Sequence, residues 1–278
     1  MQSLVLGTAQ WGNPYGVTNT QGRLTDETLA EIIAVAKQSG IRAIDTAGIY
    51  GDAESRLAPW AAGFTITTKV RGADPNTIPA QLQASLAALG QGSIDACLIH
   101  DWALLTDAQA KASAEQLEDM QRQGLVQQIG VSAYDETDLN RAVSIFGHLE
   151  IAQVPINVLD GRLTNANILQ TLASHGTKIQ ARSVFLQGLL AARSDTQLGQ
   201  HPDVIKFHDW CDARAASPID VSLSFIKKLP WVSSVVAGVT SAAEFAEISA
   251  SWNSNIETVG LDGLGSGDMK LLDPRQWT

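Results

Sequence analysis

The sequence is short of cysteine, of positive charge and of long apolar runs, and each shortage excludes a class of protein. It contains two cysteines, Cys97 and Cys211, in 278 residues. Cys97 lies within an apolar run typical of a buried strand, so we expect neither a disulfide framework nor a cysteine-based zinc site. No window is apolar over the roughly 20 residues that a transmembrane helix needs, which predicts a protein without a membrane span.

The balance of charge narrows the range of partners. The chain has 19 lysines and arginines against 29 aspartates and glutamates, which gives a net charge of −10. Because there is also no basic cluster, nucleic acids and anionic membrane surfaces are disfavoured as partners. The first residues, Met1 to Gly7, lack the positive region and the apolar core of a secretory signal. We therefore expect a cytoplasmic protein, a monomer by default, that acts on a small molecule.

A strand pattern and a helix pattern alternate along the chain. Short β-branched runs predict strands, and stretches with apolar residues three and four positions apart predict the helices between them. The expected strands are residues 3–6, 41–44, 64–68, 94–99, 126–131, 150–154, 177–181 and 232–237. The expected helices begin near residue 25 and after residue 75, and cover 54–60, 108–123, 136–146, 165–174, 204–213, 222–228 and 242–251.

Eight strand–helix alternations favour one closed (β/α)8 TIM barrel, an α/β fold, over an open doubly wound sheet. An open dinucleotide-binding sheet would need a G-x-G-x-x-G turn after its first strand, and residues 7–12 (GTAQWG) lack that spacing. We expect a single domain over residues 1–278, with the stretch from Trp252 onward as a C-terminal covering segment.

Ionisable residues follow three successive strands of the expected barrel. Asp45 ends the second strand with Tyr50 in the turn after it, Lys69 ends the third, and His100 ends the fourth. The ends of parallel strands meet on one rim, so these residues are expected to converge. Singly, each has an ordinary structural explanation: a capping aspartate, a solvated lysine, a half-buried tyrosine or histidine. Together, at neighbouring exits, they indicate a catalytic site.

Proton donation to a carbonyl group is the chemistry that suits this set. A free tyrosine has a pKa of about 10, too high for an efficient general acid at neutral pH. An ammonium group beside Tyr50 favours the phenolate and is expected to lower its pKa, while Asp45 keeps Lys69 charged and in place. His100 can donate a hydrogen bond that orients the carbonyl oxygen.

The same residues resemble the signature of the aldo-keto reductase family. The resemblance rests on Gly40, Asp45-Thr46-Ala47, Tyr50-Gly51, Lys69 after Thr67-Thr68, and Leu98-Ile99-His100. It continues through residues 129–132 (IGVS), 153–157 (QVPIN) and 187–190 (QGLL), and so spans nearly the whole chain. It implies a metal-free, NAD(P)H-dependent and reversible reduction of aldehydes or ketones, by an oxidoreductase acting on the CH–OH group of donors. In this reading Tyr50 is the general acid, Lys69 and Asp45 assist it, and His100 orients the substrate.

The resemblance also implies a cofactor site for NADP(H) or NAD(H). Ser132 and Gln153 correspond to residues that bind the nicotinamide amide, and Gly7, Thr8 and Asp45 to residues at its ribose end. The other expected cofactor residues are Arg182, Ser183, Gln187, Gly188, Gly238, Thr240, Ser241 and Glu244.

Three positions in this region depart from the family pattern. Ala133 follows Ser132 where many relatives carry Asn, so one amide contact is lost. Arg182 stands where many relatives place a stacking tyrosine; its guanidinium can stack on the nicotinamide ring, or turn outward to pair with an acid such as Asp160. Glu244 stands where an arginine is common, and a carboxylate repels a 2′-phosphate but accepts hydrogen bonds from ribose hydroxyls. We therefore expect a relaxed cofactor preference or a tilt toward NAD(H).

Aromatic side chains near the strand exits are candidates for the substrate pocket. Trp11, Tyr15 and Trp102 are expected to form a wall for an apolar or carbohydrate-like carbonyl compound, with Asp101 adding polar selection. Packing of the tryptophans against the barrel rim is an equal alternative. The sequence does not predict which carbonyl compound is the substrate.

Three other functions stay open as alternatives. In some relatives this fold serves as a nucleotide-binding regulatory or sensor protein with little turnover. A Schiff-base lyase would use Lys69 as its nucleophile, which needs a lysine away from carboxylates. A metal-dependent hydrolase would need clustered ligands, whereas His148, His175, His201 and His208 lie apart in expected helices and loops. We expect no metal.

Overall fold

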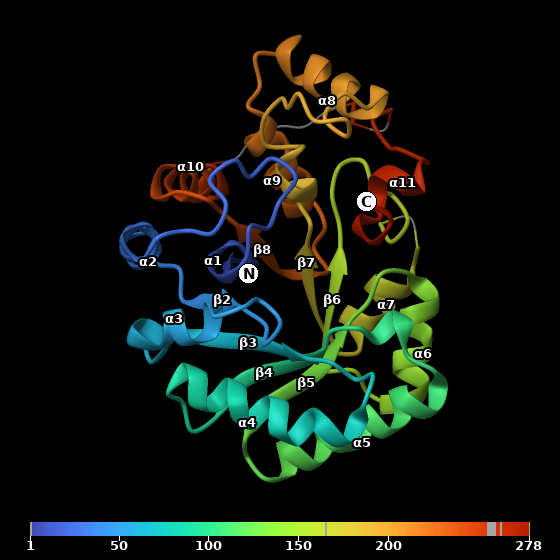
Figure 1. Ribbon diagram of the computed structural model, residues 1–278. Helices are drawn as coiled ribbons and strands as arrows, with labels where there is room; N and C mark the ends of the chain where they lie inside the picture. Colours follow the sequence, from blue (N-terminus) through green and yellow to red (C-terminus); the bar gives the residue numbers. More distant parts are fainter. Residues whose placement is uncertain (1, 165, 255–259, 262, 278) are drawn as a thin grey trace.

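The eight expected strands close into a barrel in the computed structural model, which describes residues 2–164, 166–254, 260–261 and 263–277 (Figure 1). Neighbouring strands are parallel and follow sequence order, and the last strand closes on the first. The strands are β1 Ser3–Gly7, β2 Ala43–Asp45, β3 Thr65–Val70, β4 Ile94–Ile99, β5 Val126–Ser132, β6 Ile151–Pro155, β7 Lys178–Arg182 and β8 Val232–Gly238. The predicted (β/α)8 barrel is confirmed.

Helices surround the barrel and connect its strands (Figure 1). The helices are α1 Ala9–Gly12, α2 Asp26–Gln38, α3 Ala53–Ala61, α4 Ile78–Leu89, α5 Asp107–Arg122, α6 Glu136–Phe146, α7 Ile168–Ser174, α8 Pro202–Asp212, α9 Pro218–Lys227, α10 Ala242–Asn253 and α11 Met269–Leu272. The predicted start of α7 at residue 165 lies outside the described residues. None of the described helices combines the length and the apolar character needed to cross a bilayer.

The element boundaries agree closely with the prediction, and the differences have local causes. β2 begins at Ala43 instead of residue 41, because the Ile41 amide turns back to the Ala36 carbonyl and completes the end of α2. Several strands run one residue further than expected because their last residue still pairs with a neighbour, as Gly7 does with Asp45. Helix α1 was not expected, since the first predicted helix begins near residue 25.

The barrel interior holds polar side chains among the apolar ones. Lys69, Gln153 and Gln180 are all buried on strands β3, β6 and β7. Buried polar groups cost free energy unless they are hydrogen-bonded. A buried lysine with two buried glutamines therefore marks the part of the barrel where a polar network must exist.

The described part of the C-terminal segment packs on the loops that follow β6 and β7. Leu264 and Leu271 are buried in a cluster with Leu159, and the Ser266 amide donates a 2.8 Å hydrogen bond to the Leu159 carbonyl. Helix α11 lies near the end of the chain, beside these loops (Figure 1). Residues 263–277 thus form the expected covering segment.

Candidate active site

The four predicted catalytic residues meet at the carboxyl ends of β2, β3 and β4. Asp45 is the last residue of β2, Lys69 is on β3, and His100 directly follows β4. Tyr50 lies in the turn between β2 and α3. Because neighbouring strands are parallel, residues far apart in the sequence become neighbours on one rim.

Lys69 is the centre of this group. Its Nζ donates hydrogen bonds to Asp45 Oδ1 at 2.6 Å, to the Thr46 carbonyl at 2.8 Å and to Tyr50 Oη at 3.4 Å. Only 1% of the Lys69 surface is exposed. An ammonium has three donors, so all of them are used within the protein, and the side chain is held in one place.

Burial and neighbouring charges shift the pKa values of Lys69 and Tyr50 in opposite directions. Burial alone would lower the pKa of Lys69, but Asp45 and Tyr50 outweigh it and raise that pKa, so the lysine stays charged. Burial raises the pKa of Tyr50 by more than the Lys69 charge lowers it. The expectation of a lowered tyrosine pKa is therefore wrong for the free protein, because it left out the burial of the phenol. Tyr50 carries its proton at neutral pH.

His100 packs edge-on against Tyr50, with the ring centroids 5.8 Å apart and the planes at 84°. Burial, followed by the charges of Lys69, Arg182 and Arg71, lowers its pKa to about 3. The imidazole is therefore neutral at physiological pH and keeps one N–H to donate. Its Nδ1 atom is buried and has no hydrogen-bond partner within the described residues.

A polar network continues from Asp45 across the barrel. Gln153 Nε2 donates to Asp45 Oδ2 at 2.6 Å and also to Gln180 Oε1. A carboxylate that binds the Lys69 ammonium can only accept, so the group facing it must be the NH2 of Gln153. Both N–H groups of that amide are thereby used, and its Oε1 is left as the polar atom that can face a ligand.

Gln180 was not predicted, although the sequence carries a signal for it. Glutamine is mostly exposed in proteins, so a glutamine within the buried residues of β7 needs a polar partner. Gln153 on β6 is a second such residue. Polar residues in the strands of a parallel barrel interior point to a buried network.

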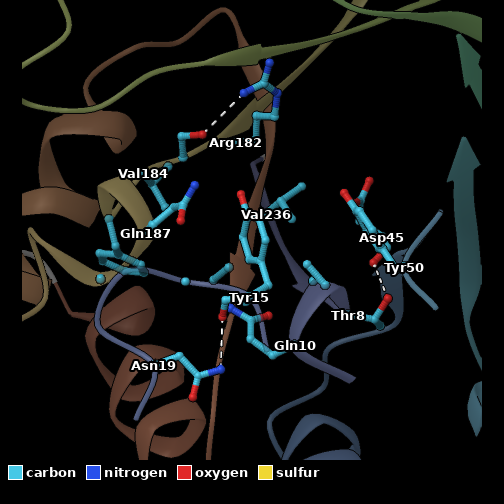
Figure 2. Close-up of a pocket in the computed structure, with 18 of the residues that line it drawn as sticks. Thr8, Gln10, Tyr15, Asn19, Asp45, Tyr50, Arg182, Val184, Gln187 and Val236 are labelled. Atoms are coloured by element: carbon cyan, nitrogen blue, oxygen red, sulfur yellow. Dashed lines mark hydrogen bonds between the residues drawn. The ribbon is translucent and has the colours of Figure 1, made fainter. Parts of the chain in front are cut away.

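A cavity lined by Asp45, Tyr50 and His100 extends along the barrel rim to the start of α10. Figure 2 shows Tyr50 and Asp45 on one side of it, Arg182 on another, and Tyr15 and Gln10 nearby. The predicted residues that line it are Gly7, Thr8, Tyr15, Asp45, Tyr50, His100, Ser132, Gln153, Arg182, Ser183, Gln187, Gly188, Gly238, Thr240 and Glu244. Lys69 and Ser241 are not part of this lining.

Trp11 and Trp102 do not line the cavity. Both are fully buried at 0% exposure, and Trp102 Nε1 donates a 3.0 Å hydrogen bond to the Asp138 carbonyl. The expectation that they form a substrate wall is corrected to the alternative, in which they pack beneath the rim. An apolar ring next to a strand end gains more free energy in the core than at an open mouth. Tyr15 keeps its predicted place at the cavity.

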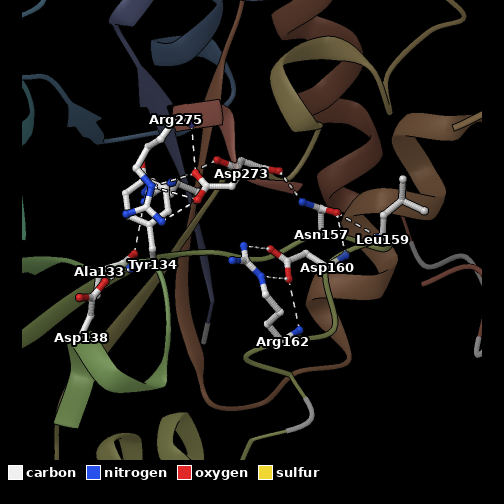
Figure 3. A network of polar contacts seen from close by, with 11 residues as sticks. Ala133, Tyr134, Asp138, Asn157, Leu159, Asp160, Arg162, Asp273 and Arg275 are labelled. Atoms are coloured by element: carbon white, nitrogen blue, oxygen red, sulfur yellow. Dashed lines mark hydrogen bonds and ion pairs between the residues drawn. The ribbon is translucent and has the colours of Figure 1, made fainter. Parts of the chain in front are cut away.

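Arg182 does not pair with Asp160, because Asp160 is bound by Arg162 at 2.6 Å (Figure 3). Instead, Arg182 Nη2 donates to the Ala133 carbonyl at 3.2 Å and Nη1 donates to Ser183 Oγ at 3.3 Å. The small side chain and free carbonyl of Ala133 suit this arrangement. The two departures at positions 133 and 182 thus form one structural unit.

Two guanidinium groups lie over the ring of Tyr134, a cavity residue that sequence reasoning missed. The Arg182 guanidinium is 4.2 Å and the Arg275 guanidinium 3.8 Å from the ring centroid. Arg275 is neutralised by a 2.6 Å ion pair with Asp273 in the C-terminal segment (Figure 3). Arg275 lies 141 residues from Tyr134 in the sequence, so no local pattern reveals the contact.

At the end of the cavity next to α10, the side chain of Glu244 is hydrogen-bonded to Thr240, which precedes the helix. Ser241 caps α10 by accepting a hydrogen bond from the Glu244 amide. Glu244 Oε2 accepts from the Thr240 amide at 2.7 Å and from the Thr240 hydroxyl at 3.0 Å. Among the described cavity-lining residues at this end there is no lysine or arginine. The other oxygen of Glu244 is left to accept a hydrogen bond.

The backbone of the turn that contains Tyr50 packs directly against Gly12. A Cβ atom at position 12 would lie 1.9 Å from the Tyr50 carbonyl oxygen, which no relaxation of a side chain could relieve. We expect Gly12→Ala to displace Tyr50 and to lower kcat by about 100-fold, since a displacement of about 1 Å has this effect. Gly63→Ala is the matched control, because its Cβ would meet its nearest neighbour at 3.5 Å. Equal kcat values in steady-state assays of the two variants would show that the turn does not need Gly12.

The described residues contain no group of three or more His, Cys, Asp or Glu side chains placed to hold a metal ion. The site consists of a buried ion pair, a protonated tyrosine and a neutral histidine beside a cavity. This arrangement suits proton transfer to a polarised oxygen.

Known proteins resemble this chain over much of its length. The sequence profile of the Aldo/keto reductase family matches residues 3–259. The methylglyoxal reductase DkgB of Yersinia pestis is 29% identical over 234 residues, covering 81% of this chain and 82% of that protein. An aldo-keto reductase of Mycolicibacterium vanbaalenii is 26% identical over 276 residues, covering 92% and 90%. DkgB of Escherichia coli O157:H7 is 27% identical over 174 residues, and the match spans 65% of that protein.

Among solved structures, the holo form of an aldo-keto reductase from Bacillus halodurans has a TM-score of 0.77 at 17% identity, covering 92% of this chain and 88% of that one. At this identity the likeness concerns the fold alone. The profile match covers all eight strands of the barrel and the residues that meet at its rim. The chain belongs to the aldo/keto reductase family.

Proposed function

We propose that this protein reduces an aldehyde or ketone to the alcohol with NADH or NADPH, in a reversible reaction. The observation that carries the proposal is the contact of the protonated Tyr50 with the charged Lys69 beside a cavity that runs to Glu244. Tyr50 and most of the residues expected to bind the dinucleotide, among them Gln153 and Thr240, line this one cavity. The relatives that are named methylglyoxal reductase and aldo-keto reductase also support the proposal.

In the proposed reaction an aldehyde, NADH and a proton give an alcohol and NAD⁺. The cofactor, when bound, supplies the hydride to the carbonyl carbon. Tyr50 Oη gives its proton to the carbonyl oxygen, and the neutral His100 donates a hydrogen bond to that oxygen. Lys69 stabilises the phenolate that Tyr50 becomes, and Asp45 holds Lys69 in place.

The polar groups that are left without protein partners fit a nicotinamide dinucleotide. Gln153 Oε1 is the remaining acceptor of its amide, next to Ser132 on β5. Gln10 Oε1 is buried without a hydrogen-bond partner within the described part of the chain, at a place where it faces Gly238. In our proposal Ser132 and Gln153 hold the carboxamide, and Gly238 allows the close approach of the nucleotide.

The acidic end of the cavity favours a cofactor without a 2′-phosphate. Glu244 repels that phosphate, and its unused oxygen can accept hydrogen bonds from ribose hydroxyls. We expect NADH to bind as tightly as NADPH or more tightly in titrations of cofactor fluorescence. A preference for NADPH of about a hundredfold, an energy that needs charged contacts, would contradict this assignment.

A Schiff-base mechanism is not favoured by the surroundings of Lys69. Its ammonium is charged, almost fully buried and bound to a carboxylate at 2.6 Å, whereas a nucleophilic lysine must be neutral. The nucleotide-binding sensor is distinguished by experiment: tight NADH binding without oxidation of NADH by any aldehyde would favour it.

The direct test is the oxidation of NADH and NADPH, measured at saturating cofactor with aromatic and sugar-like aldehydes. We expect turnover that depends on both the aldehyde and the protein. If neither cofactor is oxidised with any aldehyde, the proposed function is wrong.

The pH profile of reduction follows from the two shifted pKa values. The pKa of His100 is about 3, so this residue is neutral, and does not titrate, from about pH 5 upward. The pKa of Tyr50 is raised by burial, so its proton is lost only above its ordinary value of about 10. We expect kcat/KM for a neutral aldehyde to be flat from about pH 5 to 9 and to fall at higher pH. A rise or fall centred near pH 6.5 would mean that His100 titrates in its ordinary range.

A further inference from the structure

Arg182 lines the cavity and has no carboxylate partner within the described residues. Eight other arginines form ion pairs with Asp or Glu: Arg23, Arg56, Arg71, Arg122, Arg141, Arg162, Arg193 and Arg275. Asp160, which the sequence offers as a partner for Arg182, is bound to Arg162, and Asp273 is bound to Arg275 (Figure 3). In a chain with a net charge of −10, a cavity cation without an acid is unusual.

We propose that Arg182 binds an anionic group, a carboxylate or a phosphate, that the carbonyl substrate carries. The inference rests on the proposed reductase function and narrows it to one class of substrate, carbonyl compounds with an acidic group.

The Arg182 guanidinium is held in position, but not all of its N–H donors are used. Its bonds to the Ala133 carbonyl and to Ser183 Oγ use two of its five N–H donors. The Tyr134 ring, 4.2 Å away, fixes the plane of the group. A planar fork that is already oriented loses little conformational freedom when it binds a carboxylate or phosphate.

Arg182 and the predicted catalytic groups Tyr50 and His100 line one cavity. Tyr15 lines it together with Tyr50 and His100. Burial dominates the shifts in pKa of all three residues, and the charge of Arg182 contributes to each of them. A substrate with its carbonyl oxygen at Tyr50 and its acidic group toward Arg182 would be oriented at two points.

The phosphates of the nucleotide are a second possible source of the anion, so the test separates the two. We would measure kcat/KM for 4-formylbenzoate and for the neutral isostere 4-formylbenzamide in the wild type, Arg182→Met and Arg182→Lys. Arg214→Met is the matched control, because Arg214 also lies 4.2 Å from an aromatic ring, that of Trp210, and is outside the cavity lining.

We expect the wild type to prefer 4-formylbenzoate and Arg182→Met to lose about 10- to 100-fold of that preference, the worth of a hydrogen bond to a charged group. Arg182→Lys should restore part of it, and Arg214→Met should keep all of it. The proposal is overturned if the wild type does not prefer the anion, or if Arg182→Met keeps the preference. It is also overturned if Arg182→Met instead weakens NADH and ADP-ribose binding equally, since the anion would then belong to the nucleotide.

A binding measurement keeps this inference separate from the proposed function. If the wild type reduces neither aldehyde, the reductase proposal fails, and calorimetry with benzoate and benzamide still tests Arg182. Loss of benzoate binding in Arg182→Met supports the anion site. Equal benzoate binding in the wild type and in Arg182→Met refutes it.

Discussion

Tyr50→Phe is expected to lower kcat for aldehyde reduction by about 10²- to 10⁴-fold, the usual contribution of a general acid. The substitution removes a single oxygen, the atom that Lys69 Nζ contacts at 3.4 Å, and leaves the ring that packs against His100. The cavity keeps its shape, so the dissociation constant for NADH should stay within about twofold. Steady-state kinetics and a fluorescence titration of NADH measure the two quantities.

Tyr15→Phe is the comparison for this result. Tyr15 also lines the cavity, but Lys69 donates to Tyr50 and not to Tyr15. We expect its effect on kcat to be at least about tenfold smaller than that of Tyr50→Phe. Similar losses in the two variants would mean that Tyr50 is a wall residue and that the proton comes from elsewhere.

Lys69→Met is expected to damage both catalysis and stability. It leaves the buried Asp45 carboxylate without its cation, which typically costs about 3–5 kcal/mol of unfolding free energy. It also removes the charge that stabilises the phenolate of Tyr50, so kcat should fall by about 100-fold or more. Urea unfolding followed by circular dichroism gives the first quantity, and NADH oxidation gives the second.

Two further variants separate the loss of the charge pair from the loss of a side chain. Lys178→Met changes an exposed lysine on β7 and should alter the unfolding free energy by less than about 0.5 kcal/mol. Lys69→Met combined with Asp45→Asn should be more stable than Lys69→Met alone, because no uncompensated carboxylate remains. A double variant that is less stable by the full sum of the two single effects would contradict the assignment of the pair.

The fold and the position of Asp45, Lys69 and His100 on one rim could be predicted because their signals are local. The alternation of strand and helix patterns specifies the barrel, and the parallel arrangement of its strands brings Asp45, Lys69 and His100 to one rim. The direction in which a side chain points after a strand end is not local. Trp11 and Trp102 follow strand exits as Tyr15 does, yet they turn into the core while Tyr15 faces the cavity.

Other features of the site depend on how deeply a side chain is buried and on contacts between segments that are far apart in the sequence. The sign of the Tyr50 shift is decided by burial against the Lys69 charge, and a sequence gives the charge but not the depth. The contact of Arg275 with Tyr134 needs the C-terminal segment to fold back over the barrel. Gln180 could have been predicted from the sequence, because a glutamine in a buried strand indicates a hydrogen-bond partner inside the barrel.

In the proposed reaction the carbonyl carbon receives a hydride from the cofactor while Tyr50 supplies the proton. The most direct measurement is the mass spectrum of the alcohol formed from an aldehyde and [4,4-²H₂]NADH in ordinary water. We predict one deuterium on the carbinol carbon, with the alcohol nearly absent when Tyr50→Phe replaces the wild type. An alcohol without deuterium, or equal amounts of labelled alcohol from both proteins, would contradict the account.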